Sequence, residues 1–89
     1  MVIIDEAEPS VKNDRSTMRR LIVDGLKVRG GTVEAPNWEH LLHELGLPVC
    51  HGNKRQWRKA LFSLRYKYGT LRVIPFRRDG ERWGRYYLK

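Results

Sequence analysis

Two groups of side chains in this sequence have types and spacings that could support chemistry, and the first consists of potential metal ligands. His40 and His43 are three residues apart, and Cys50 and His51 follow closely. Zinc sites use such nitrogen and sulfur ligands, but these spacings match none of the common zinc patterns, so we expect no metal site. No nucleophile–base pair or phosphate-cradling glycine loop accompanies them. We therefore expect no catalytic residues, no enzyme activity, no cofactor and no small-molecule substrate.

The second group is a run of cations and aromatics in residues 53–69, NKRQWRKALFSLRYKYG, which carries no acid. At the 100° step of a helix, one stripe of this run is apolar: Trp57, Ala60, Leu61, Leu64 and Tyr68. The other side and its flanks are cationic and aromatic: Lys54, Arg55, Arg58, Lys59, Phe62, Arg65 and Tyr66. Asn53 and Gln56 have the spacing of a reciprocal N-terminal cap, and Gly69 is a typical helix exit. The run predicts a helix with a core face and a face suited to phosphate.

The distribution of charge supports an anionic partner. Residues 1–52 hold 6 basic and 8 acidic residues (net −2), whereas residues 53–89 hold 12 and 2 (net +10), and the halves sum to the overall +8. Such asymmetry is typical of proteins that bind nucleic acid or another anionic surface. Cys50 has no second cysteine to pair with, and no run of 18 apolar residues or secretory signal occurs. A cytoplasmic protein without a membrane span is therefore expected.

The helices that must position this run precede it in the chain. Residues 1–14 begin with Val2, Ile3 and Ile4 and then turn acidic, which predicts either a disordered tail or a strand that adds to a sheet edge. Residues 15–29 form a first helix with a core face: Met18, Leu21, Ile22, Gly25 and Leu26. A second helix begins at Pro36, at its first position, or at Asn37, as its cap, and stops at Leu45-Gly46-Leu47. Residues 32–33 are extended and suit a third strand of a small sheet.

A β-hairpin follows the cationic helix. Residues 70–76 and 83–89 are rich in β-branched and aromatic residues, and Asp79-Gly80 between them is a strong two-residue turn signal. That turn sets the pairs of the register: Phe76 with Trp83, Ile74 with Arg85, Val73 with Tyr86, and Leu71 with Leu88. This register places Leu71, Val73, Tyr86 and Leu88 on one face, which we assign to the core. Pro75 predicts that its strand lies at an edge.

Helix, short strand, two helices and a hairpin with a basic tip give an α+β chain whose order resembles the winged-helix variant of the helix-turn-helix fold. The resemblance covers residues 15–89, as a single domain after the tail at 1–14. It implies that residues 53–68 form the recognition helix in a major groove. It also implies that residues 77–82 form a wing on the backbone or minor groove. The link at residues 46–52 is longer than a tight helix-turn-helix turn, and no second wing follows.

On this resemblance, the expected function is double-stranded DNA binding that regulates transcription, or another DNA transaction, by occupancy. Arg55 and Arg58 suit bidentate contacts to guanine, and Lys54 and Lys59 suit phosphate. Phe62 suits either a thymine methyl or packing against the wing. The remaining expected contacts lie beside these or on the wing: Arg65, Tyr66, Arg77, Arg78, Arg82 and Arg85.

Two other classes of function stay open at this point. A winged helix could bind an acidic protein surface, or it could bind RNA through exposed aromatics that stack on unpaired bases. A homodimer or larger assembly is expected for tight DNA binding, since one small module buries only about 600–1,000 Å². If the protein is encoded by a bacterium or a phage, we expect it to associate with the nucleoid.

Overall fold

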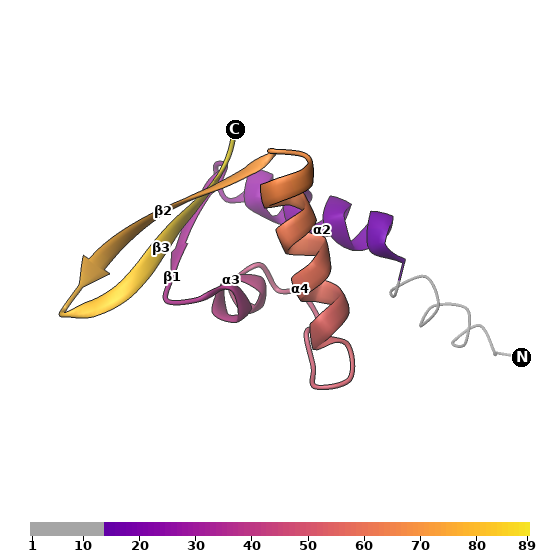
Figure 1. Ribbon diagram of the computed structural model, residues 1–89, viewed down its shortest axis with the longest axis horizontal. Coiled ribbons are helices and arrows are strands. Elements are labelled where there is room, and N and C mark those ends of the chain that lie inside the picture. Colours follow the sequence, from indigo (N-terminus) through magenta and orange to yellow (C-terminus); the bar gives the residue numbers. More distant parts are fainter. Residues whose placement is uncertain (1–13) are drawn as a thin grey trace, which may run out of the picture.

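The computed structural model describes residues 14–89, which form three α-helices and one three-stranded antiparallel sheet. In chain order the elements are α2 (Arg15–Val28), β1 (Thr32–Ala35), α3 (Trp38–Glu44), α4 (Lys54–Phe62), η1 (Ser63–Lys67), β2 (Leu71–Arg78) and β3 (Glu81–Leu88) (Figure 1). The predicted α+β class is confirmed. Apart from Asp14, the predicted tail lies outside the described residues. Within the described range, no helix is both long enough and apolar enough to cross a bilayer.

The sheet has the order β1-β3-β2, so the last strand is central and both of its neighbours are edges. All four predicted cross-strand pairs are present, including Phe76 with Trp83 and Leu71 with Leu88. The predicted third strand is confirmed and runs two residues further, to Ala35, pairing Val33 with Tyr86. Pro75 lies on β2, an edge strand, where the missing N–H does not break a central ladder.

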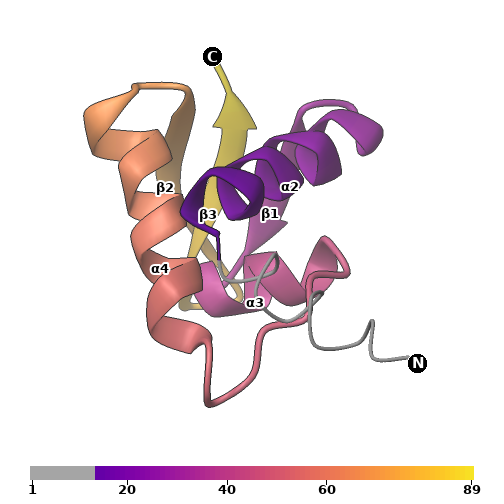
Figure 2. The same cartoon turned by 90° about the vertical axis from the view of Figure 1, so that its right-hand side faces the viewer.

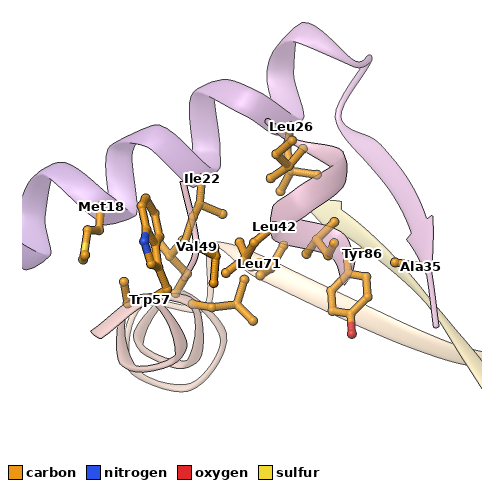
Figure 3. Packing of buried hydrophobic residues seen from close by; sticks show 14 residues of the cluster. Met18, Ile22, Leu26, Ala35, Leu42, Val49, Trp57, Leu71 and Tyr86 are labelled. Atoms are coloured by element: carbon orange, nitrogen blue, oxygen red, sulfur yellow. The ribbon is translucent and has the colours of Figure 1, made fainter. Parts of the chain in front are cut away.

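One face of the sheet and the three helices enclose the core (Figures 1 and 2). Leu71 and Tyr86 contribute from the predicted inner face of the hairpin and are buried, with Val73 and Leu88 packed beside them. The indole of Trp57 is 1% exposed and lies near Met18 and Ile22 of α2 (Figure 3). The hairpin beyond this core projects away from the helices (Figure 1).

Two of the sequence signals for helix ends are confirmed at α3. Asn37 caps α3, because its Oδ1 accepts the backbone N–H of His40 at 2.7 Å. At the other end, Gly46 has φ 76° and the N–H of Leu47 donates to the carbonyl of Leu42, which is the expected Schellman geometry.

The predicted reciprocal cap at Asn53 is wrong. Its Oδ1 accepts the N–H of Cys50 at 2.7 Å and its Nδ2 donates to the carbonyl of Pro48 at 2.8 Å. The side chain therefore organises the loop before α4 and caps no helical N–H. The longer link between α3 and α4, whose buried Val49 packs into the core, needs these two bonds to fix its path.

The cationic helix also departs from a single regular α-helix. It ends in the π-helical turn η1, where the N–H of Tyr68 donates to the carbonyl of Ser63 at 3.0 Å. Such a turn holds one more residue than an α turn, so Tyr68 is rotated out of the predicted stripe and is 50% exposed. Leu21 of α2 is likewise more exposed, at 36%, than its predicted core position requires. Gly69 leaves the helix with φ 66°, as expected.

Candidate nucleic-acid interface

The two faces of α4 are divided as the helical period predicts. Trp57, Ala60 and Leu61 are buried against the core. Arg55, Arg58 and Lys59 are exposed on the opposite side. Burial of the apolar stripe fixes the rotation of the helix about its axis, so the cations must face solvent.

Aromatic rings lie among the cations on this outer face. The guanidinium of Arg58 lies 5.1 Å from the ring centroid of Phe62. Arg65 lies 4.7 Å from the centroid of Tyr66, whose ring meets Phe62 edge-on at 5.8 Å. Cation–π contacts at these distances restrict the guanidinium groups without neutralising them. Tyr66 is 71% exposed, so its ring stays available to a partner.

An open groove of about 610 Å³ runs along this face. It is lined by Arg15, Arg55, Arg58, Lys59, Phe62, Ser63, Tyr66 and Lys67. Sequence reasoning did not assign Arg15 or Lys67 to the site. Lys67 belongs to the acid-free run and could have been included on that signal. Arg15 comes from α2, and only tertiary packing brings it beside α4.

A second groove of about 500 Å³ lies at the N-terminal end of α4. Trp38 of α3 and His51 of the preceding loop line it together with Lys54, Arg55 and Arg58. The ammonium of Lys54 lies 3.3 Å from the carboxylate of Glu39 on α3. Lys54 is therefore partly neutralised, whereas the two arginines beside it are not.

The hairpin separates its arginines onto two faces. Glu34 of β1 holds Arg78 at 3.2 Å and Arg85 at 3.0 Å on the face away from the helices. The guanidinium of Arg78 also lies 4.6 Å from the ring of Trp83, so this outer face is a network of ion pairs and rings. The Nε1 of Trp83 is buried without a hydrogen-bond partner among the described residues.

Arg77 and Arg82 are cross-strand partners next to the turn. Because side chains alternate between faces along a strand, they continue the face that bears Leu71 and Tyr86. Both are exposed, and Arg77 donates to the carbonyl of Gly80 at 3.2 Å. With Pro75 and Phe76 they line an open groove of about 380 Å³.

The ion pairs divide the cations among the predicted site residues into two sets. Lys54, Arg78 and Arg85 each contact a carboxylate. Six others have no acidic partner within residues 14–89: Arg55, Arg58, Lys59, Arg65, Arg77 and Arg82. The second set carries a positive charge that the described part of the protein does not offset.

The potential zinc ligands do not form a cluster. Within residues 14–89, no three His, Cys, Asp or Glu side chains come together in a way that could hold a metal ion. His40 instead lies 3.4 Å from Glu44, one turn further along α3. Cys50 is a free, exposed thiol.

Comparison with known proteins adds no assignment to this geometry: no family model, no curated protein and no solved structure matches the chain.

Proposed function

We propose that this protein is a winged-helix protein that binds double-stranded DNA and regulates transcription by occupancy. The order of elements supports the fold, since a helix, a strand, two helices and a hairpin follow one another along the chain as in that architecture. In this proposal α4 is the recognition helix, and the hairpin of β2 and β3 is the wing.

The observation that carries the proposal is the outer face of α4, where Arg55, Arg58 and Lys59 are exposed and have no acidic partner within the described residues. An α-helix with its side chains is about 10–12 Å across, and the major groove of B-DNA is about 12 Å wide. A helix that presents such a face can therefore enter the groove while its cations meet both bases and phosphates.

The neighbouring contacts suggest a role for each cation. Arg58 lies against Phe62, which keeps its planar fork at the surface for a bidentate contact to guanine. Lys59 and Arg65 suit phosphate. Lys54 would have to exchange its ion pair with Glu39 for a phosphate, at a cost of only about 0.2–1 kcal/mol for an exposed pair.

Binding measurements distinguish this proposal from its alternatives. Fluorescence anisotropy gives the affinity for duplex DNA, single-stranded DNA and duplex RNA, each of random sequence, between about 50 and 200 mM salt. We expect preference for duplex DNA and a steep loss of affinity with salt. Preference for single strands would favour base stacking on Tyr66, which is 71% exposed. No binding to any nucleic acid at the lowest salt would favour an acidic protein partner.

The two faces of the hairpin provide a matched test of the wing. The double variant Arg77→Ala/Arg82→Ala removes the unpaired arginines, and Arg78→Ala/Arg85→Ala removes the two that Glu34 holds. Both changes lower the net charge equally. Each lost phosphate contact flattens the salt slope by about 0.9, so the first variant is expected to flatten it by about 1.8 and the second by much less. Equal slopes would refute this division of the wing.

A further inference from the structure

The side of α4 that faces away from the hairpin is the α2 side, and cations gather there as well. Arg15, in the first turn of α2, lines the 610 Å³ groove together with Lys59 and Lys67 of the cationic helix. That groove has five cationic lining residues and no acidic one. One wall of this groove is therefore formed by α2, which belongs neither to the proposed recognition helix nor to the proposed wing.

A neighbouring groove of about 530 Å³ extends this surface along α2. Its lining includes the cations Arg19, Arg20 and Lys27, with Asp24 as the one acidic member. The ring of Tyr68 joins the two grooves, because the guanidinium of Arg19 lies 5.0 Å and the ammonium of Lys67 lies 5.5 Å from its centroid. The π turn is what brings Tyr68 to this position.

Within residues 14–89, the few acids near this surface do not neutralise it. Asp14 accepts a hydrogen bond from the hydroxyl of Thr17 at 2.9 Å and makes no ion pair within the described residues. Asp24 offsets one of the three cations in its groove. The ridge formed by Arg15, Arg19, Arg20 and Lys67 therefore retains a net positive charge, and we name these four residues the α2 edge.

The α2 edge and the hairpin lie on opposite sides of α4. Along the long axis of the molecule, α4 lies between the projecting hairpin and the N-terminal end of α2 (Figure 1). A major groove is bordered by two sugar-phosphate backbones, one on each side of an inserted helix. If α4 occupies the groove, one backbone faces the hairpin and the other faces α2.

We propose that the α2 edge is a second phosphate-binding surface, which holds the DNA backbone on the side of α4 opposite the hairpin. This inference rests on the proposed function. The ligand is the phosphate diester chain of a duplex, and the contacts are charge-assisted hydrogen bonds from exposed guanidinium and ammonium groups. The cleft between α2 and α4 and the hairpin then form the two sides of a clamp.

The test compares two double variants that remove the same charge. Arg15→Ala/Lys67→Ala alters the α2 edge, and Arg29→Ala/Arg72→Ala removes two exposed arginines elsewhere, at the end of α2 and on the sheet face away from the helices. Both variants change exposed residues, and circular dichroism checks that each is folded. Binding to a random-sequence duplex is measured against salt from about 50 to 200 mM.

The α2-edge variant is expected to flatten the slope of log affinity against log salt by about 1.8, which corresponds to two lost phosphate contacts. The control variant is expected to leave the slope close to that of the wild type. Equal slopes in the two variants would overturn the proposal while leaving duplex binding by α4 intact. If the wild-type protein bound no duplex at the lowest salt, the proposed function itself would fall, and the α2 edge with it.

Discussion

Replacement of Trp57 by alanine tests whether the cationic helix is oriented by its buried face. The indole is 1% exposed, is one of the largest fully buried side chains, and packs where α4 meets α2 (Figure 3). A tryptophan buries roughly 150–250 Å², which at about 25 cal/mol per Å² corresponds to about 4–6 kcal/mol. A compact unfolded chain lowers such values by about 10–40%.

A second term acts in the opposite direction. The Nε1–H of Trp57 is buried and has no hydrogen-bond partner among residues 14–89. An unpaired buried donor costs about 1–3 kcal/mol, and the alanine variant no longer bears that cost. We therefore expect Trp57→Ala to lower the free energy of unfolding by about 2–3 kcal/mol, at or just below the low end of the range for such truncations.

The companion variant Trp57→Phe keeps one ring and, like the alanine variant, removes the N–H, so the difference between the two variants measures the packing of the ring. We expect it to lose less than about 2 kcal/mol, since the retained ring offsets part of the cavity. Leu21→Ala is the control: this side chain shares the predicted spacing of the core face but is 36% exposed, so it should lose less than about 1 kcal/mol.

Urea unfolding followed by far-ultraviolet circular dichroism gives these free energies for all three variants. This signal reports the whole fold, whereas tryptophan fluorescence would change with the substitution itself. If Trp57→Phe were as unstable as Trp57→Ala, the retained ring would contribute no packing, and the reasoning about burial at this position would be wrong. An unchanged stability in Trp57→Ala would mean that the faces of α4 are assigned backwards.

Four further predictions concern binding and pH. Arg58→Ala is expected to lose about 1–3 kcal/mol on a selected DNA site and less on random DNA, as measured by anisotropy; equal losses would make Arg58 a phosphate contact. Residues 1–13 contain Asp5, Glu6 and Glu8, which could compete with DNA for the cationic face. Deletion of residues 1–13 is expected to raise duplex affinity, most at low salt, where screening is weak. An unaltered affinity at low salt would argue against this competition. Burial raises the pKa of the Tyr86 phenol, and the Arg65 charge opposes this with a smaller effect. The contribution of this phenol to stability is therefore complete below the unfolded pKa of about 10 and is lost as the pH rises through the native pKa. In urea unfolding, raising the pH above about 10 should therefore destabilise Tyr86→Phe less than the wild type. Glu34→Gln should cost about 1 kcal/mol or less, because its two ion pairs are only partly buried, and a larger loss would mark the pairs as essential to the hairpin.

Local signals predict much of this fold. The register of the hairpin follows from Asp79-Gly80, because a two-residue turn leaves one pairing and the pleat then assigns each side chain to a face. The core face of α4 follows from the helical period, since Trp57 and Leu61 lie one turn apart. These inferences need only the chain within a few residues of each element.

The errors arise where a local signal competes with a distant contact. Asn53 has the spacing of a cap, but its amide group bonds both Cys50 and Pro48 in the preceding loop and makes no bond to a helical N–H. No sequence period predicts the π turn, since all residues of Ser63–Lys67 are compatible with an ordinary α-helix. Contacts between residues far apart in the sequence cannot be predicted from local signals either. Glu34 is separated from Arg78 by 44 residues, and Arg15 is brought beside α4 only by packing.

The π turn has a consequence for how chain length and orientation are related in this protein. It holds one residue more than an α turn before β2 begins, so deletion of a single residue within Ser63–Lys67 would allow an uninterrupted α-helix. Both kinds of turn bring the chain back to the same side of the helix axis, so this deletion would leave the direction of the hairpin nearly unchanged. The regular turns of α4 hold no extra residue, and a deletion there would rotate everything after it by about 100°. The π turn can thus lose a residue without reorienting the hairpin, whereas the regular turns before it cannot.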